Sequence, residues 1–229
     1  MSNNCQFFKL HFHGKLTKHP NLKPTEKELT MNQRLADGRR LLLASTSLFR
    51  RELLARLALP FAAVAPDIDE TPLPDEKASA LVARLAGEKA RAVARQEPEA
   101  LVIGADQVAV LDQLILGKPV THERAVQQLT RASGKMATFF TGLCLLDSAS
   151  GRRQTAVVPF QVKFRQLHLQ QIENYLRREQ PYQCAGSFKS EGLGIALFDR
   201  LEGEDPTSLV GLPLIRLTRM LEAEGISVL

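Results

Sequence analysis

The sequence has no tryptophan, few cysteines and no long apolar run, and each shortage excludes a class of protein. Its 229 residues include three cysteines, at positions 5, 144 and 184, with no paired spacing. So sparse a set argues against a disulfide framework or a structural zinc site and is typical of a reducing compartment. No stretch approaches the roughly 20 apolar residues that a membrane-spanning helix needs, and no secretory signal opens the chain. We therefore expect a cytoplasmic protein outside the membrane, with 44% apolar residues to build a core.

The excess of basic charge is confined to the start of the chain. Residues 1–40 carry eight Lys or Arg against three Asp or Glu, whereas residues 41–229 carry 22 of each sign. Because duplex nucleic acids are bound through extended basic surfaces, the neutral body argues against a nucleic-acid partner. Residues 1–39 read as a polar, disordered leader in which prolines interrupt any helix, and Met31 is a candidate natural start.

The remainder, residues 40–229, predicts one domain. Strands and helices first alternate and long hairpins then follow, which favours an α/β fold with a mixed, twisted sheet flanked by helices and a cleft between two lobes. The expected strands are 40–44, 61–65, 101–104, 108–111, 114–116, 136–147, 154–167 and 195–200, and the expected helices are 47–57, 79–96, 121–132, 169–179 and 212–224.

The segment 41–54, Leu-Leu-Leu-Ala-Ser-Thr-Ser-Leu-Phe-Arg-Arg-Glu-Leu-Leu, is the most informative part of the chain. It predicts a buried strand, a hydroxylated turn and then an amphipathic helix. Free N–H groups at the start of that helix, beside Arg50 and Arg51, favour an anion such as phosphate. The alternative is that Ser47 only caps the helix while both arginines are solvated.

Three further polar clusters follow. Asp106 comes after the apolar run 101–104, and ligands of open α/β sheets bind beyond the carboxyl ends of such strands. Cations suit phosphate oxygens and carboxylates suit Mg²⁺ or Mn²⁺, so the mixture indicates a phosphorylated substrate and a divalent metal. Solvated loops and turns are the structural alternatives, and no Walker A, GxGxxG or Ser-His-Asp pattern is present. The clusters are the acidic loop Asp67, Asp69 and Glu70, the pair Asp106 and Gln107, and the lysines Lys89, Lys118 and Lys189.

Seven short motifs follow one another along the chain. They are Leu-Ala-Ser-x-Ser with Arg-Arg (43–51), Asp-x-Asp-Glu-Thr-Pro (67–72), Glu-Lys-Ala (88–90), Gly-Ala-Asp-Gln (104–107), Gly-Lys-Pro (117–119), Ala-Gly-Ser-Phe-Lys-Ser-Glu-Gly (185–192) and Val-Gly-Leu-Pro (210–213). Taken in this order, they closely resemble the Maf family of nucleotide pyrophosphatases over about residues 40–226. The resemblance implies an α/β fold with a deep cleft and the hydrolysis of nucleoside triphosphates to monophosphate and pyrophosphate with a divalent cation. It also implies a cytoplasmic location and makes a homodimer a candidate assembly.

The resemblance also implies roles for individual residues. Asp106 would accept the proton of the attacking water and contribute to the metal site, and Glu70 would help to bind the metal or position the water. The triphosphate would be bound by Ser45, Arg50, Lys89 and Lys118. Arg51 is assigned no firm role, because the local spacing differs by one residue among branches of the family.

Three residues separate branches of this family. Phe49, Gln107 and Glu191 resemble the 7-methyl-GTP pyrophosphatase branch, whereas the dTTP/UTP branch carries Arg, Thr and Gln. An aromatic face attracts the cationic methylated purine, and a carboxylate can accept from the guanine N1–H and N2–H₂ groups. The branch usually has Trp where this chain has Phe49 and Pro where it has Leu48, so weaker stacking is expected.

Several alternatives stay open at this point. Phe49 could pack in the core, and Glu191 could form a structural ion pair with Lys189 or Arg200. The chain could act on dTTP or UTP instead. It could also be a non-catalytic protein that regulates cell division through binding.

Overall fold

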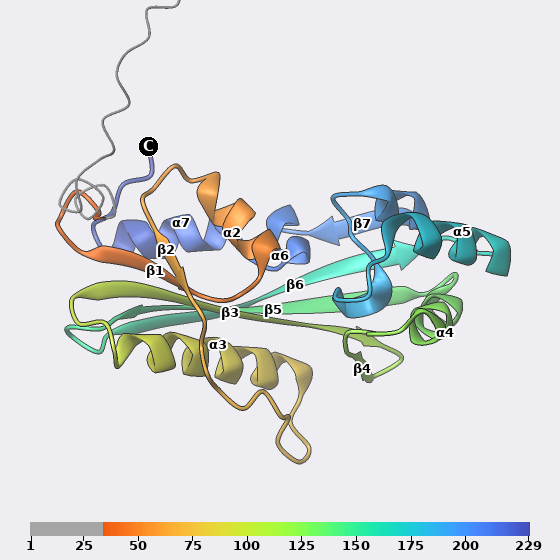
Figure 1. The fold of residues 1–229 in the computed structure, drawn as a ribbon, viewed down its shortest axis with the longest axis horizontal. Coiled ribbons are helices and arrows are strands. Elements are labelled where there is room, and N and C mark those ends of the chain that lie inside the picture. The colour runs from red at the N-terminus through yellow and green to blue at the C-terminus, as the bar shows by residue number, and fades with distance from the viewer. Residues whose placement is uncertain (1–33) are drawn as a thin grey trace, which may run out of the picture.

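The structure is a computed structural model that describes residues 34–229 (Figure 1). The expectations for residues 1–33, including Met31 as a natural start, lie outside the described residues. Within residues 34–39, Leu35 is buried against the main core, and Arg39 donates to the carbonyl oxygen of Glu224 at 2.6 Å. No helix in this described range is long and apolar enough to cross a membrane.

A seven-stranded mixed sheet forms the centre of the molecule, as the sequence predicts. Its order is β2-β1-β3-β5-β6-β7, with β4 paired to β3. β1 pairs in parallel with β2 and β3, and the other pairs are antiparallel. The strands are β1 (Arg40–Ala44), β2 (Ala62–Val64), β3 (Ala100–Leu111), β4 (Leu114–Leu116), β5 (Met136–Asp147), β6 (Arg153–Phe164) and β7 (Phe198–Gly203).

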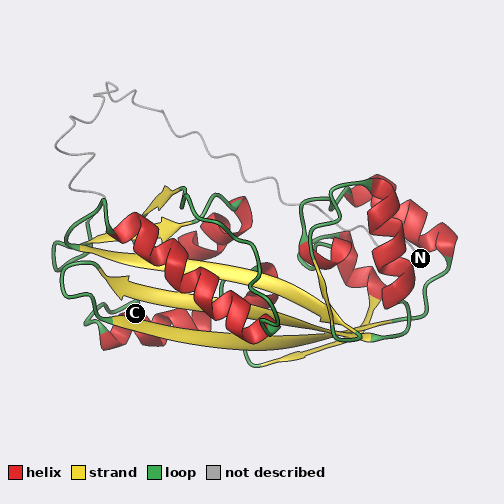
Figure 2. Ribbon diagram, turned by 90° about the horizontal axis from the view of Figure 1, so that it is seen from below, coloured by secondary structure: helices red, strands yellow, loops and turns green. Residues whose placement is uncertain are grey.

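Helices cover both faces of the sheet and build a second lobe. Figure 1 shows α3 on one face and α2, α6 and α7 on the other, while Figure 2 shows the two lobes joined by the long strands. The second lobe contains α4, α5 and two short 3₁₀ turns. The helices are α2 (Leu48–Ala55), α3 (Ala78–Ala94), α4 (His122–Ala132), α5 (Leu169–Glu179), α6 (Pro206–Val210) and α7 (Leu214–Ala223), and the turns are η1 (Ala185–Ser187) and η2 (Leu193–Leu197).

The apolar run of β1 is continuous because both of its faces are buried. Leu41 and Leu43 pack in the core that includes α2 and α7, whereas Leu42 and Ala44 pack in the core that includes α3. Successive side chains of a strand point to opposite faces, so a strand covered on both sides has no polar positions.

Two glycines allow α3 to lie directly on the sheet. A Cβ atom at Gly104 of β3 would lie 2.0 Å from the carbonyl oxygen of Ala86, and one at Gly142 of β5 would lie 2.1 Å from that of Val82. Only glycine permits so close an approach of helix and strand backbones. This contact fixes the height of α3 above β3 and therefore places the side chains of α3 that face the strand.

The core of the second lobe centres on phenylalanines. Phe188 packs edge-to-face against Phe139, Phe164 and Phe198, with ring centroids 5.2, 5.8 and 4.7 Å apart. Such edge-to-face pairs are favourable beyond the area that they bury. Because Phe188 belongs to the irregular segment that follows η1, this cluster fixes that segment on the end of the sheet.

Two expectations about elements are wrong. β3 does not end before Asp106 but continues to Leu111, with Asp106 opposite Gly142 of β5. The carboxylate is tolerated within the strand because it has a cationic partner. The strand expected at 195–200 is a 3₁₀ turn followed by β7.

Helix α6 is not among the expected elements. Its five residues are too few to show a helical period, although Asp205 caps the helix and Pro206 stands at its start.

Candidate active site

A cavity of about 680 Å³ lies between the two lobes. Its walls come from the end of β1, the start of α2, the segment before α3, the middle of β3, and the irregular segments around residues 117 and 190. The nine residues to which the family resemblance assigns a role all line it: Ser45, Phe49, Arg50, Glu70, Lys89, Asp106, Gln107, Lys118 and Glu191. Asp67, Asp69 and Lys189 of the same polar clusters do not.

The centre of the cavity is a lysine between two carboxylates. Lys89 Nζ lies 2.6 Å from Asp106 Oδ1 and 2.8 Å from Glu70 Oε1. Lys89 and Asp106 are buried, whereas Glu70 is largely exposed. The close packing of α3 on Gly104 and Gly142 brings Lys89 within reach of Asp106. Asp106 Oδ2 has no hydrogen-bond partner within residues 34–229, so this oxygen is available to a ligand or to water.

Asp106 lies at the carboxyl end of the parallel part of the sheet, although it is inside a strand. β1 pairs with β3 only as far as Ala44 opposite Gly104, and the chain of β1 then turns away at Ser45. This departure opens the space above Asp106. Ligands of α/β sheets gather beyond the carboxyl ends of parallel strands, and the cavity lies at such a place. Here the space arises because β1 ends while β3 continues, not because β3 itself ends.

The start of α2 presents hydroxyl and guanidinium groups to the cavity. Ser47 caps the helix by accepting from the backbone N–H of Arg50, and Ser45 Oγ accepts from the N–H of Ser47 at 3.2 Å. Arg50 donates from Nε to the carbonyl oxygen of Gly211 at 2.9 Å and from a terminal nitrogen to Ser45 Oγ at 3.4 Å. Burial lowers the pKa of Arg50, while Asp106 and Glu70 oppose that shift.

The two arginines of this segment have different surroundings. Arg51 is exposed on α2 and is absent from the cavity lining, whereas Arg50 is half-buried and lines it. The alternative considered from the sequence was that Ser47 only caps the helix while both arginines are solvated. Ser47 does cap the helix, but only Arg51 is exposed to solvent. An anion at the helix start would therefore meet Arg50 and the hydroxyl of Ser45 together.

Gln107 faces α6 with its amide nitrogen. This nitrogen donates to the carbonyl oxygens of Ser208 and Leu209 at 2.7 and 3.2 Å and to Thr141 Oγ1 at 3.0 Å. Because carbonyl oxygens can only accept, the nitrogen must be the atom that faces them. In this arrangement Oε1 is the polar atom of Gln107 that is left for a ligand.

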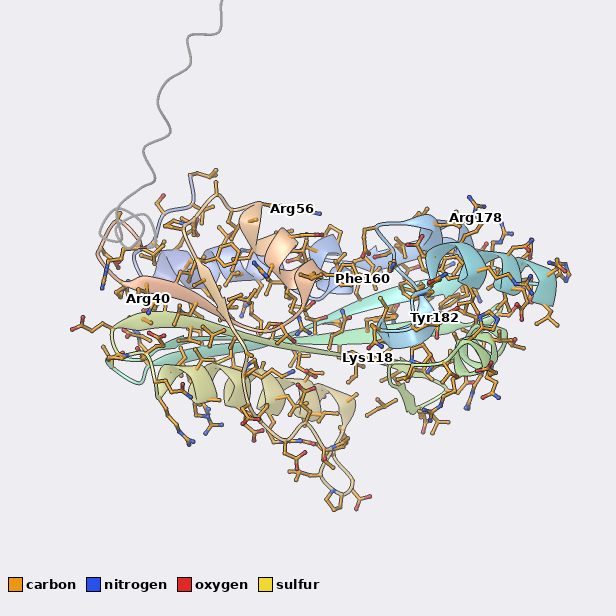
Figure 3. All side chains as sticks on the ribbon, viewed as in Figure 1. Arg40, Arg56, Lys118, Phe160, Arg178 and Tyr182 are labelled. Atoms are coloured by element: carbon orange, nitrogen blue, oxygen red, sulfur yellow. The ribbon has the colours of Figure 1, made fainter. Side chains whose placement is uncertain are left out.

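Loops of the second lobe carry Lys118 and Glu191, and both side chains are exposed. Lys118, labelled in Figure 3, lies near the middle of the long axis of the molecule. Gln128 of α4 joins the two loops, because it donates to the carbonyl oxygen of Gly117 at 3.1 Å and accepts from Ser187 Oγ at 2.5 Å. One helix side chain thus connects the segment that carries Lys118 with the segment that leads to Glu191.

Glu191 has no cationic partner among residues 34–229. Lys189 instead pairs with Glu179 at 3.3 Å, and Arg200 pairs with Glu202. The hydroxyl of Ser190 is 3.2 Å from Glu191 Oε2. The structural ion pair suggested as an alternative is therefore not formed, and the Glu191 carboxylate is accessible from the cavity.

Phe49 is half-buried, lines the cavity and belongs to none of the three hydrophobic core clusters of the described chain. The core role considered for it is therefore not what the structure shows. A ring on the wall of a cavity offers its surface to an apolar or cationic ligand.

Two contributors to the cavity escape sequence reasoning. The carbonyl oxygen of Gly211 orients Arg50, and Gly211 has φ of 116°, a conformation that favours glycine. The sequence analysis includes Gly211 in the motif Val-Gly-Leu-Pro. Its neighbours in the sequence do not reveal its contact with Arg50, which is 161 positions away. Cys184 also lines the cavity, and burial raises the pKa of its thiol to about 11.

A divalent cation fits the carboxylates of this site. Mg²⁺ commonly binds through one or two carboxylates and completes its coordination with phosphate oxygens and water, and Glu70 and Asp106 supply two carboxylates on one cavity. The described part of the chain contains no group of three or more His, Cys, Asp or Glu side chains able to hold a metal by themselves. Phosphate oxygens and water would therefore have to complete the coordination.

Known proteins resemble this chain over nearly all of its described length. A family model described as Maf-like protein matches residues 40–224. A protein of Nitrosococcus oceani named 7-methyl-GTP pyrophosphatase is 67% identical over 189 residues, which are 82% of this chain and 95% of that protein. Proteins of the same name from Pseudomonas syringae and Pseudomonas aeruginosa are each 60% identical over 188 residues, 82% of this chain and 98% of each relative.

Proposed function

The chain belongs to the Maf-like protein family, and we propose that it hydrolyses 7-methyl-GTP to 7-methyl-GMP and pyrophosphate. Its similar relatives carry the name of that activity. The observation that carries the proposal is the convergence of Lys89, Asp106 and Glu70 in the same cavity as Arg50 and Lys118. Carboxylates and cations around one hollow are what a triphosphate and its attacking water require together.

In this proposal the triphosphate lies across the cations of the cavity. Arg50 and the hydroxyl of Ser45 bind it at the start of α2, and Lys118 approaches from the second lobe. Lys89 keeps Asp106 in place and directs its remaining hydrogen-bonding capacity to a phosphate oxygen. Holding the chain of phosphates at several points supplies most of the acceleration, because phosphoryl transfer depends on positioning and charge neutralisation.

Asp106 acts as the general base. Its Oδ1 is engaged with Lys89, and Oδ2 accepts a proton from a water molecule. The oxygen of that water forms a bond to the α-phosphorus, and the bond from the α-phosphorus to the bridging oxygen breaks. The electron pair of the broken bond leaves with pyrophosphate, and the monophosphate remains.

Glu70 and Asp106 are the residues that would hold Mg²⁺ or Mn²⁺. When bound, such a cation neutralises phosphate charge and lowers the cost of the leaving pyrophosphate. Glu70 would hold the cation from the position in the cavity wall at which it contacts Lys89.

The base is recognised by the remaining residues of the cavity wall. The cationic methylated purine stacks on Phe49, an attraction of about 0.5–2 kcal/mol that grows with desolvation. The accessible Glu191 carboxylate accepts from the guanine edge, and Gln107 offers only its Oε1. Two acceptors beside an aromatic ring favour a base that carries N–H donors and positive charge.

A panel of triphosphates with pyrophosphate detection tests this function. 7-methyl-GTP, GTP, dTTP and UTP are compared with Mg²⁺ and with Mn²⁺, and we expect the largest kcat/KM for 7-methyl-GTP. A larger value for dTTP or UTP would assign the chain to the other branch. No pyrophosphate from any substrate would favour a regulatory protein without catalysis.

The location and assembly of the protein are part of the same proposal. A cytoplasmic enzyme is supported by the sparse cysteines, since Cys144 and Cys184 are both unpaired in the structure. A homodimer is supported by the family resemblance alone. Light scattering on the purified chain decides between monomer and dimer.

A further inference from the structure

The segment between β2 and α3 carries Glu70 but has no regular structure of its own. Residues 65–77 contain neither helix nor strand, and Figure 1 shows this segment passing from β2 across the sheet to the start of α3 and projecting as a loop. The Glu70 side chain is 58% exposed, so burial does not hold it in place. Some other contact must keep this carboxylate 2.8 Å from Lys89.

Arg84, on the first half of α3, binds that segment at several points. Its Nε and one terminal nitrogen donate to the two carboxylate oxygens of Glu76 at 2.7 and 2.8 Å. The same terminal nitrogen donates to the carbonyl oxygen of Thr71 at 3.1 Å. Glu76 in turn accepts from the backbone N–H of Leu73 at 3.0 Å. One guanidinium therefore gathers the three residues 71, 73 and 76.

This ion pair is stronger than an ordinary surface pair. Both its hydrogen bonds are charge-assisted and parallel, the geometry in which arginine binds a carboxylate best. The side chains of Arg84 and Glu76 are only 20% and 8% exposed. Hydrogen bonds from Arg84 lower the pKa of Glu76 to about 2, so the Glu76 carboxylate stays charged at neutral pH.

Glu70 is fixed directly beside this pair. Asp69 accepts from the N–H and the hydroxyl of Thr71 at 2.9 and 2.6 Å, which closes a tight turn around Glu70. The carbonyl oxygen of Thr71 is the atom that Arg84 holds. Arg84 lies on the same helix as Lys89, so the loop and the lysine share one support.

We propose that Arg84 is a positioning residue for the reaction, and that with Glu76 it holds residues 65–77 so that Glu70 stays beside Lys89. The role rests on the proposed function, because Glu70 matters only if phosphates are hydrolysed in this cavity. Arg84 touches neither substrate nor reacting atoms, since it is absent from the cavity lining. It acts through Glu70.

The test compares Arg84→Gln and Glu76→Gln with Glu88→Gln. Glu88 is a matched control because it also pairs with Arg84, at 3.1 Å, but lies on α3 itself and holds no part of the loop. Hydrogen exchange of residues 65–77, measured without substrate, should become about tenfold faster in the first two variants, as expected when a loop loses its anchor. It should stay unchanged in Glu88→Gln. Unchanged exchange in Arg84→Gln would overturn the proposal.

Kinetics with 7-methyl-GTP separate positioning from general destabilisation. Arg84→Gln should lower kcat by about tenfold and change KM by less than about twofold. Arg84→Lys should restore part of kcat, because lysine keeps the positive charge but cannot make the two parallel hydrogen bonds of a guanidinium. In a Glu70→Gln background, Arg84→Gln should have no further effect on kcat. An equal loss in both backgrounds would contradict action through Glu70. If the parent protein hydrolyses no triphosphate, the proposed function fails, and the loop attachment is judged by the exchange measurement alone.

Discussion

The two sides of the cavity are built in different ways. On one side, Lys89 and Asp106 project from a helix and a strand, are buried, and are hydrogen-bonded to each other. On the other side, Lys118 and Glu191 project from irregular segments and are exposed. Bond making needs distances fixed to a fraction of an ångström, which packed elements provide. Ligand recognition is less demanding, because an exposed side chain can adopt its final conformation when the ligand binds.

The same contrast holds for the contacts that support each side. Arg50 and Lys89 bind protein groups directly within the site. The loop of Lys118 is supported indirectly: Gln128 binds the backbone of the neighbouring Gly117, not the Lys118 side chain. Changes to Lys89, Asp106 or the packing that holds them should therefore affect chemistry or folding, and changes to Glu191 or its supports should affect binding and selectivity.

The largest expected effect is on catalysis. Asp106→Asn removes the proton acceptor and should lower kcat by about 10²–10⁴-fold, the usual contribution of a general base. The fold should persist because Lys89 keeps Glu70 as a partner. Asp112→Asn is the control, since Asp112 is an exposed residue of the β3–β4 turn that pairs with Lys135 and has φ of 50°, which Asn also adopts. A nearly unchanged kcat in Asp106→Asn would rule this residue out as the base.

The next effect is on the packing that holds the chemical side together. Gly104→Ala places a methyl group 2.0 Å from the backbone of α3, and should cost about 1–3 kcal/mol or more of unfolding free energy. Gly87→Ala in α3 is the matched control. Its new methyl group would meet only guanidinium ends at 3.9 and 4.0 Å, so it should stabilise the helix by about 0.5–1 kcal/mol. Urea unfolding measures both, and equal stability of the two variants would refute the packing argument.

A smaller effect is expected from the loop side. Glu191→Gln keeps the shape but removes the charge that favours a cationic base, so the preference for 7-methyl-GTP over GTP should fall about tenfold, or about 1.4 kcal/mol. The ratio of kcat/KM for the two substrates measures this preference. Glu204→Gln, an exposed change outside the cavity lining, should leave the ratio unaltered. An unaltered ratio in Glu191→Gln would show that Glu191 does not read the base.

The smallest effect concerns the support of that loop. Glu179 accepts from the backbone N–H of Leu193 at 2.9 Å and pairs with Lys189, so it holds both ends of the segment that carries Glu191. Glu179→Gln should raise KM by about two- to fivefold with little change in kcat, the scale of one partly exposed ion pair. Glu173→Gln, also on α5 but paired with His122 and Arg177, is the control. A loss in kcat rather than a rise in KM would contradict the division between the two sides.

Much of the fold and the membership of the site follow from local patterns in the sequence. The apolar run of β1 predicted a buried strand, and the expected helix at residues 169–179 has the bounds of α5. Both follow because periodicity and capping act over a few neighbouring residues. The resemblance of the ordered motifs to a family implied roles for nine residues, and these nine line one cavity. The residues by themselves indicated only that Ser45 and Asp106 follow apolar strands, where ligands of α/β sheets gather.

The tertiary structure alone decided how those residues are used. Asp106 remains in a strand because Lys89 meets it from another element, and Gln107 turns its amide nitrogen toward Ser208, 101 positions along the chain. The role of Arg84 likewise depends on where the loop of Glu70 crosses α3. Such contacts are set by how close two elements pack and which way a side chain turns. The interactions that stabilise these contacts join residues far apart in the sequence. A short stretch of sequence contains only one residue of each pair, so it cannot reveal the contact.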